Sequence, residues 1–191
     1  MISTKLTPPI DINTFSTIEE TIEYVYLEYK ATIMDRVNRP QLFGKDIFVN
    51  CKNWINYKAE MFWHLSSLSI SEIFNILPCN NDRSNLLCMN NCLVKNTQVT
   101  LVNGQVRNIC LYRGIRIRWI KEIIILANNN DCSVKKWIKD NKLHLRFTDE
   151  TVDYIIIFDI KKKYYSLKTA FPLFYINSKS NFDKDCRLYK I

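Results

Sequence analysis

Residues 143–171 read LHLRFTDETVDYIIIFDIKKKYYSLKTAF, and no other stretch says as much about the fold. It holds three apolar runs of strand length, at residues 143–147, 153–160 and 163–171, with short polar segments between them. Runs rich in β-branched and aromatic residues and bounded by turn-forming residues are typical of antiparallel strands. We therefore expect a C-terminal antiparallel sheet built from these three runs.

The residues around these runs extend the expected architecture. Residues 116–130 have the apolar spacing of an amphipathic helix, and residues 133–140 predict a short helix with Ser133 as its N-cap. Residues 171–177 are expected to continue as an edge segment, because Pro172 has no N–H to donate to a ladder. The sheet would then have about four strands.

The N-terminal part is expected to be helical. Residues 17–36 carry apolar side chains at helical spacing, and Ser16 with Glu19 fits a capping box. Residues 47–51 (IFVNC) predict a strand. The fold class is therefore α+β, with N-terminal helices packed on a C-terminal antiparallel sheet of about four strands.

Composition limits both the organisation and the chemistry. The chain has 191 residues, 47% of them hydrophobic, which is enough apolar side chain for a packed core. We expect an N-terminal helical segment over residues 1–45 and one compact domain over residues 46–191. Glycine occurs only 3 times and no glycine-rich phosphate loop is present, so P-loop and Rossmann nucleotide sites are excluded. No apolar run approaches the roughly 20 residues of a membrane span. The absence of a signal-peptide pattern and the odd number of cysteines, 7, predict a cytoplasmic protein with reduced thiols.

Positive charge is concentrated in the second half of the chain. Residues 107–191 carry 18 lysines and arginines against 9 acidic residues, whereas residues 1–106 carry 9 against 10. Such asymmetry favours a polyanionic partner, and RNA is the one we expect. Lysine-rich solvated surfaces are the alternative explanation, and a membrane surface is not expected because no basic amphipathic helix stands out.

Both histidines lie in informative surroundings. His64 follows an aromatic pair in the segment FWHLSSL, and His144 shares one face of its strand with Arg146. An imidazole and a guanidinium on the same strand face suit a phosphodiester. The alternatives are a hydrogen-bonded, half-buried histidine at position 64 and ordinary solvent-facing side chains at positions 144 and 146.

Two further groups of residues could bind phosphate. Arginine forms paired, charge-assisted hydrogen bonds to phosphate, and the predicted helix and the residues before it carry Arg113, Arg116 and Arg118. The end of the last long strand carries Lys168, Thr169 and, shortly after, Tyr175. Each group also has a structural interpretation, as a solvated helix face and as a strand end with core aromatics.

These residue types could cleave RNA without a metal. The 2′-OH attacks the adjacent phosphorus with the help of a general base, an acid protonates the leaving oxygen, and a cation stabilises the developing charge. DNA lacks the 2′-OH, so this mechanism selects RNA. We therefore expect no cofactor.

Metal sites are the less favoured alternatives. Cys88 and Cys92, with Cys79 upstream and Cys110 downstream, have a spacing that could hold zinc, although reduced thiols explain them equally well. The carboxylates that a metal nuclease would need occur only as Asp149-Glu150-Asp153 and as an Asp159-Ile160-Lys161 triplet.

In this order, the segments HLSSL, R-x2-R-x-R-W-I, YIIIF and YYSLKTAFP resemble the BECR-fold ribonucleases, which include barnase, EndoU, colicin and RelE-like enzymes. The resemblance covers residues 55–190 and is nearest to phage- or plasmid-borne nuclease toxin domains. It implies that His64 is the histidine of an HL(S/T)G segment, that Arg116 or Arg118 binds phosphate, and that Thr169 is the hydroxyl of TAFP. Ser67 departs from the glycine of that pattern. The asparagine- and cysteine-rich residues 79–97, which we expect to form a loop, also depart from it, as either a specificity insertion or a metal knuckle.

The expected function is a metal-independent endoribonuclease toxin that cleaves tRNA or mRNA. Catalysis is assigned to His64, Arg116, Arg118, Thr169 and Tyr175. RNA binding is assigned to Arg113, His144, Arg146 and Lys168. The alternative is a non-catalytic nucleic-acid-binding protein, an anti-defence or regulatory factor, that uses the same basic surface. An acidic immunity protein or antitoxin is a further expected partner.

Overall fold

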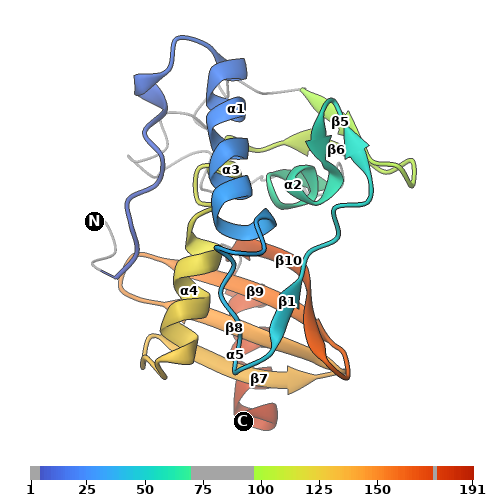
Figure 1. Ribbon diagram of the computed structural model, residues 1–191. Helices are drawn as coiled ribbons and strands as arrows, with labels where there is room; N and C mark the ends of the chain where they lie inside the picture. Colours follow the sequence, from blue (N-terminus) through green and yellow to red (C-terminus); the bar gives the residue numbers. More distant parts are fainter. Residues whose placement is uncertain (1–4, 70–96, 174–175) are drawn as a thin grey trace. The chain divides into compact units, whose positions relative to one another are not determined.

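The computed structural model describes residues 5–69, 97–173 and 176–191, and the protein belongs to the α+β class (Figure 1). The chain forms two compact units. The first unit takes residues up to 8, 31–50 and 118–191, and the second takes residues 9–30 and 51–117. The expected boundary between residues 45 and 46 lies inside the first unit.

A five-stranded sheet forms the first unit. Its order is β1-β10-β9-β8-β7, and the strands are β1 (Asp46–Phe48), β7 (Val134–Lys139), β8 (Lys142–Thr148), β9 (Asp153–Ile160) and β10 (Tyr164–Pro172). The last four are antiparallel, which confirms the sheet expected from residues 143–171. β1 adds a parallel edge strand next to β10, in the region where a strand was predicted over residues 47–51.

Two helices cover the opposite faces of this sheet, as Figure 1 shows: α4 (Trp119–Asn128) and α5 (Ile176–Tyr189). The ring centroids of Trp119 in α4 and Tyr154 in β9 lie 5.7 Å apart. Cys186 of α5 instead belongs to the apolar cluster around Ile155, the next residue of β9. Because adjacent strand residues point to opposite faces, one helix packs on each side. We refer to the side covered by α5 as the α5 face.

The predicted helix over residues 133–140 is wrong, because these residues form β7 and the turn after it. Asp140 and Asn141 have φ values of 49° and 55°, which is the left-handed backbone of a two-residue hairpin turn. Val134 and Trp137 are buried three residues apart, so the burial pattern within β7 has a helical period. Pairing with β8 along all six residues overrides it.

The predicted edge segment over residues 171–177 is also wrong beyond the strand end. β10 ends at Pro172, and Ile176 begins α5, a helix that the sequence reasoning missed. The predicted helix over residues 116–130 exists in shortened form as α4, whose Trp119 side chain is buried. Its first residues instead form a turn after the separate helix α3 (Leu111–Gly114).

The predicted helix at residues 17–36 is confirmed as α1 (Ile18–Tyr29), which continues as a π-helical turn, η2 (Lys30–Met34), after the short 3-10 turn η1 (Ile12–Thr14). Its capping box lies one residue later than expected: Thr17 accepts from the Glu20 N–H, and the Glu20 carboxylate accepts from the Thr17 N–H.

Short elements complete the second unit: β2 (Trp54–Ile55), β3 (Lys58–Ala59), α2 (Glu60–Leu65), β4 (Ser67–Ser69), β5 (Gln98–Thr100) and β6 (Val106–Ile109). β4, β6 and β5 form a sheet in this order. The core of the second unit includes the mutually packed rings of Tyr26, Tyr29 and Phe62. Most of the loop predicted over residues 79–97 lies outside the described residues. In the described part of the chain, no helix is long and apolar enough to cross a membrane.

Candidate nucleic-acid interface

Three predicted site residues share the α5 face of the sheet. The register places Trp137, His144, Ile157 and Thr169 in one row across strands β7 to β10. A second row contains Lys135, Arg146, Ile155 and Phe171. Directly opposed residues of neighbouring strands lie on the same face, so the sheet brings His144, Arg146 and Thr169 together.

α5 covers the β7–β8 half of this face. His144 is 7% exposed and stacks on Trp137, with ring centroids 5.0 Å apart and planes 6° apart. Arg146 is 3% exposed and binds both carboxylate oxygens of Asp153 at 2.8 Å, and its Nη1 lies 2.9 Å from Asp183 of α5. The expected RNA-binding residues His144 and Arg146 are therefore buried in this arrangement.

Lys168 and Thr169 lie on the more open, β10 side. The β9–β10 register shifts between Leu167 and Thr169, so Lys168 is the extra residue of a β-bulge. Its side chain is exposed, and its ammonium lies 3.9 Å from Asp159. Thr169 is half-buried, so both predicted residues border accessible surface.

The second unit holds His64, Arg113 and Arg116. His64 lies in the last turn of α2 and is half-buried, but Arg113 and Arg116 are only 5% and 4% exposed, so they do not form the solvated helix face that was one alternative. Arg113 Nη1 donates to the Ser67 carbonyl at 2.6 Å, and Arg116 lies 3.4 Å from the Tyr112 ring centre.

Arg107 joins this group, although the sequence reasoning missed it. It lies in β6, and its guanidinium donates to both the hydroxyl and the carbonyl of Ser67, at 2.8 and 2.9 Å. Ser67, where the BECR pattern expects glycine, is thus the residue on which Arg107 and Arg113 converge. The serine hydroxyl has a structural use here, as an acceptor for a buried arginine.

The remaining candidates are dispersed or lie outside the described residues. Arg118 precedes α4 in the first unit, and Tyr175 is not among the described residues. Of the possible zinc ligands, only Cys110 is described, and it is buried before α3. No cluster of three or more metal-ligating side chains occurs among the residues that the structure places.

A different place in the first unit combines aromatic rings with cations on accessible surface. Phe48 of β1 and Tyr164 of β10 are 39% and 37% exposed, with ring centroids 5.6 Å apart. They line a hollow of about 340 Å³, together with Arg36, Arg39 and Lys163. We call this group the edge site.

Local structure explains how the edge site forms. The Arg39 guanidinium donates to the carbonyls of Met34 and Ile47, at 2.5 and 2.7 Å, and so ties the end of the π-helical turn to β1. The Arg39 guanidinium is therefore taken up by backbone hydrogen bonds. Arg36 and Lys163 are exposed and pair with no carboxylate in the described part of the chain. The parallel pairing of β1 with β10 places Phe48 beside Tyr164. This long-range pairing is the reason that sequence reasoning missed the site.

Charge reinforces the edge site. The first unit carries 19 lysines and arginines against 11 acidic residues, whereas the second carries 8 of each, so the whole net charge of +8 belongs to the first unit. The exposed turn Lys161–Lys163 leads directly into Tyr164, and Lys45 lies over the Tyr165 ring at 5.4 Å. Exposed rings for stacking and flexible cations for phosphates are the groups that bind single-stranded nucleic acid.

Comparison with known proteins adds no family to this description: no family model matches the chain, and no curated protein or solved structure is significantly similar to it. The resemblance to BECR-fold ribonucleases therefore stays a prediction.

Proposed function

We propose that this protein binds single-stranded RNA at the edge site. The observation that carries the proposal is the exposed pair Phe48–Tyr164, which lines a hollow beside Arg36 and Lys163. Bases would stack on the two rings, and phosphates would lie against the two cations and the neighbouring Lys161 and Lys162.

Removing the two rings tests this proposal. Each base–aromatic stack contributes about 1–3 kcal/mol, so Phe48→Ala/Tyr164→Ala should weaken binding of a labelled single-stranded oligouridylate by about tenfold or more. Fluorescence anisotropy at fixed salt measures the affinity, and thermal melting confirms that the variant is folded.

Two exposed aromatics of the second unit provide the matched control. Trp54 and Tyr57 are 51% and 95% exposed, and Trp54→Ala/Tyr57→Ala removes a similar aromatic surface without touching the edge site. This control should bind RNA like the unchanged protein. If both double variants lose affinity equally, or if neither does, the edge site is not the binding site.

Endoribonuclease activity is the second candidate, and one observation favours it. His64 is half-buried at the end of α2, three residues before Ser67, where the buried Arg107 and Arg113 converge. An imidazole and guanidinium groups in one unit are the residue types needed for acid–base cleavage of RNA and for stabilising phosphate charge. In that case an acidic immunity protein or antitoxin would be the expected inhibitor.

Cleavage and binding are separated by one comparison. The unchanged protein is incubated with end-labelled RNA in the presence of EDTA, alongside His64→Ala. An endoribonuclease would give fragments that disappear with His64→Ala while RNA affinity is kept. Intact RNA together with normal binding would show that the protein binds RNA without cleaving it.

A further inference from the structure

We infer that the sheet face beneath α5 is a second binding surface for single-stranded RNA, and that α5 is a cap which RNA displaces. This surface is made of other residues than the edge site and lies on another part of the sheet. α5 covers aromatic and cationic side chains that suit RNA, and the contacts that hold α5 in place are weak.

The covered face carries groups suited to RNA. Trp137 and His144 stack in parallel, and Arg146 lies in the neighbouring row of the sheet. Lys135 and Lys139 belong to the same face of β7. Flat rings flanked by cations on a β-sheet form a platform for unstacked bases and their phosphates.

Two polar atoms under α5 are left without hydrogen bonds. Trp137 is fully buried and His144 is 7% exposed, and within the described part of the chain neither Trp137 Nε1 nor His144 Nδ1 has a hydrogen-bond partner. A buried polar atom without a partner is destabilising, and protein interiors rarely leave such atoms unsatisfied. A ligand with donors and acceptors, such as a nucleobase, would satisfy both.

α5 itself is lightly packed. The structure describes all 14 residues of this helix, and Cys186 is the only buried one, while Ile176 and Leu188 are 79% and 64% exposed. Phe182 adds a partly buried ring against the Trp137 cluster. So little buried apolar surface gives a helix low resistance to local opening.

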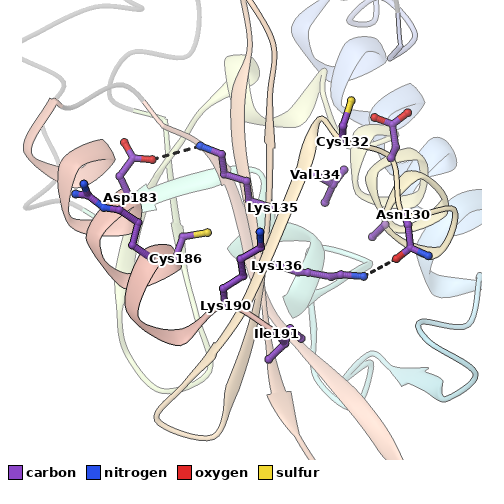
Figure 2. Close-up of a pocket in the computed structure, with 12 residues that line it drawn as sticks. Asn130, Cys132, Val134, Lys135, Lys136, Asp183, Cys186, Lys190 and Ile191 are labelled. Atoms are coloured by element: carbon purple, nitrogen blue, oxygen red, sulfur yellow. Dashed lines mark hydrogen bonds and ion pairs between the residues drawn. The ribbon is translucent and has the colours of Figure 1, made fainter.

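Ion pairs and one backbone bridge, between Trp137 and Lys190 directly after the helix, supply the remaining attachment. Asp183 lies 2.9 Å from Arg146 and 3.6 Å from Lys135, and Asp185 lies 2.8 Å from Lys139. Figure 2 shows Lys135 pointing toward Asp183, with Cys186 on the same helix. The two aspartates are partly exposed, so these pairs are open to competition, and a polyphosphate competes for the same cations. RNA phosphates can therefore replace Asp183 and Asp185.

The predicted residues fit this arrangement. Thr169 lies in the same row as His144, and Lys168 is exposed beside it, so the β10 side of the face is accessible while α5 is docked. RNA would first meet Lys168 and Thr169 and then extend toward Trp137 as α5 moves away.

The decisive experiment compares two variants of equal net charge. Asp183→Asn/Asp185→Asn removes the carboxylates that hold α5, and Asp140→Asn/Glu150→Gln removes two exposed carboxylates elsewhere in the first unit. Both are made in the Phe48→Ala/Tyr164→Ala background, so that the outcome does not depend on the edge site. The cap variant should bind labelled oligouridylate about tenfold more tightly than its charge-matched control, a typical coupling between sites.

Hydrogen exchange on the unchanged protein supplies a readout that needs no variant. RNA should protect the amides of β7 and β8 and speed exchange in α5, whereas a purely structural helix would keep or gain protection. Equal affinity of the two charge-matched variants, or α5 amides that exchange no faster with RNA bound, would overturn the inference.

Discussion

His144 stacks flat on Trp137 beneath α5, and this burial lowers the pKa of its imidazole. Lys142 and Lys139 lower it further, whereas the Lys142 backbone and the Asp185 carboxylate of α5 raise it. The folded protein therefore binds a proton at His144 less readily than the unfolded chain, whose histidine has a pKa near 6.5.

Acid should consequently destabilise the protein through this residue. Between about pH 7.5 and pH 5.5 the unfolded state takes up the proton first, so the contribution of neutral His144 is complete above the unfolded pKa and declines as the pH falls. His144→Phe keeps a flat ring against Trp137 and removes the titration. Urea unfolding should show a smaller loss of stability on acidification for the variant than for the unchanged protein. Equal losses would show that His144 is not responsible.

Arg146 and Asp153 form a buried pair, with side chains only 4% and 12% exposed. Arg146→Met should lower the free energy of unfolding by about 3–5 kcal/mol, because it leaves Asp153 without its main partner. Adding Asp153→Leu should recover much of that loss, since a well-packed apolar pair avoids the cost of burying a charge. Urea denaturation of both variants measures the difference, and a double variant as unstable as the single one would contradict this account.

At the scale of single elements, the identity of the N-cap residue of α1 can be tested directly. Thr17, not Ser16, caps the helix, and its hydroxyl accepts from the Glu20 N–H at 3.1 Å. Thr17→Ala should therefore cost about 1 kcal/mol of stability, whereas Ser16→Ala should cost a few tenths at most. Chemical denaturation of the two variants measures the two losses of stability. A larger loss for Ser16→Ala would show that Ser16, not Thr17, caps the helix.

β7 shows how pairing overrides local pattern. Its buried residues Val134 and Trp137 are three apart, so residues 133–140 favour a helix when the segment is considered alone. The Asp140-Asn141 pair was the available signal, because two residues that tolerate positive φ between apolar runs are typical of a hairpin. α5 had a weaker signal, since Phe182 and Cys186, four residues apart, are its main contacts with the sheet.

At the scale of the whole molecule, the net charge of +8 lies entirely in the first unit, so RNA affinity should fall steeply with salt. Replacing Lys161, Lys162 and Lys163 with glutamine should reduce the slope of log affinity against log salt by about 2, if each lysine meets one phosphate of a single strand. Lys30, Lys52 and Lys184 lie elsewhere, and their replacement by glutamine gives the same net charge. That control should lower affinity slightly and leave the slope nearly unchanged. Equal slopes for both variants would place the phosphates away from the turn.

The sequence by itself determined the α+β class, the three C-terminal strands and the first helix. These follow from local causes: alternating or continuous apolar runs, turn residues between them, and a polar cap before a helical stretch. It also located the positive charge in the second half of the chain. Residues such as Lys168 and Thr169 were found because a strand end is visible in the sequence itself.

Only the tertiary structure decided which of the basic residues are accessible. Arg113, Arg116, His144 and Arg146 look like surface residues in the sequence, yet carbonyl groups, rings and a helix from distant segments enclose them. The edge site arises in the opposite way, because the pairing of β1 with β10 joins Phe48 to Tyr164 across more than a hundred residues. Burial and long-range pairing depend on which segments meet, and no local pattern encodes that choice.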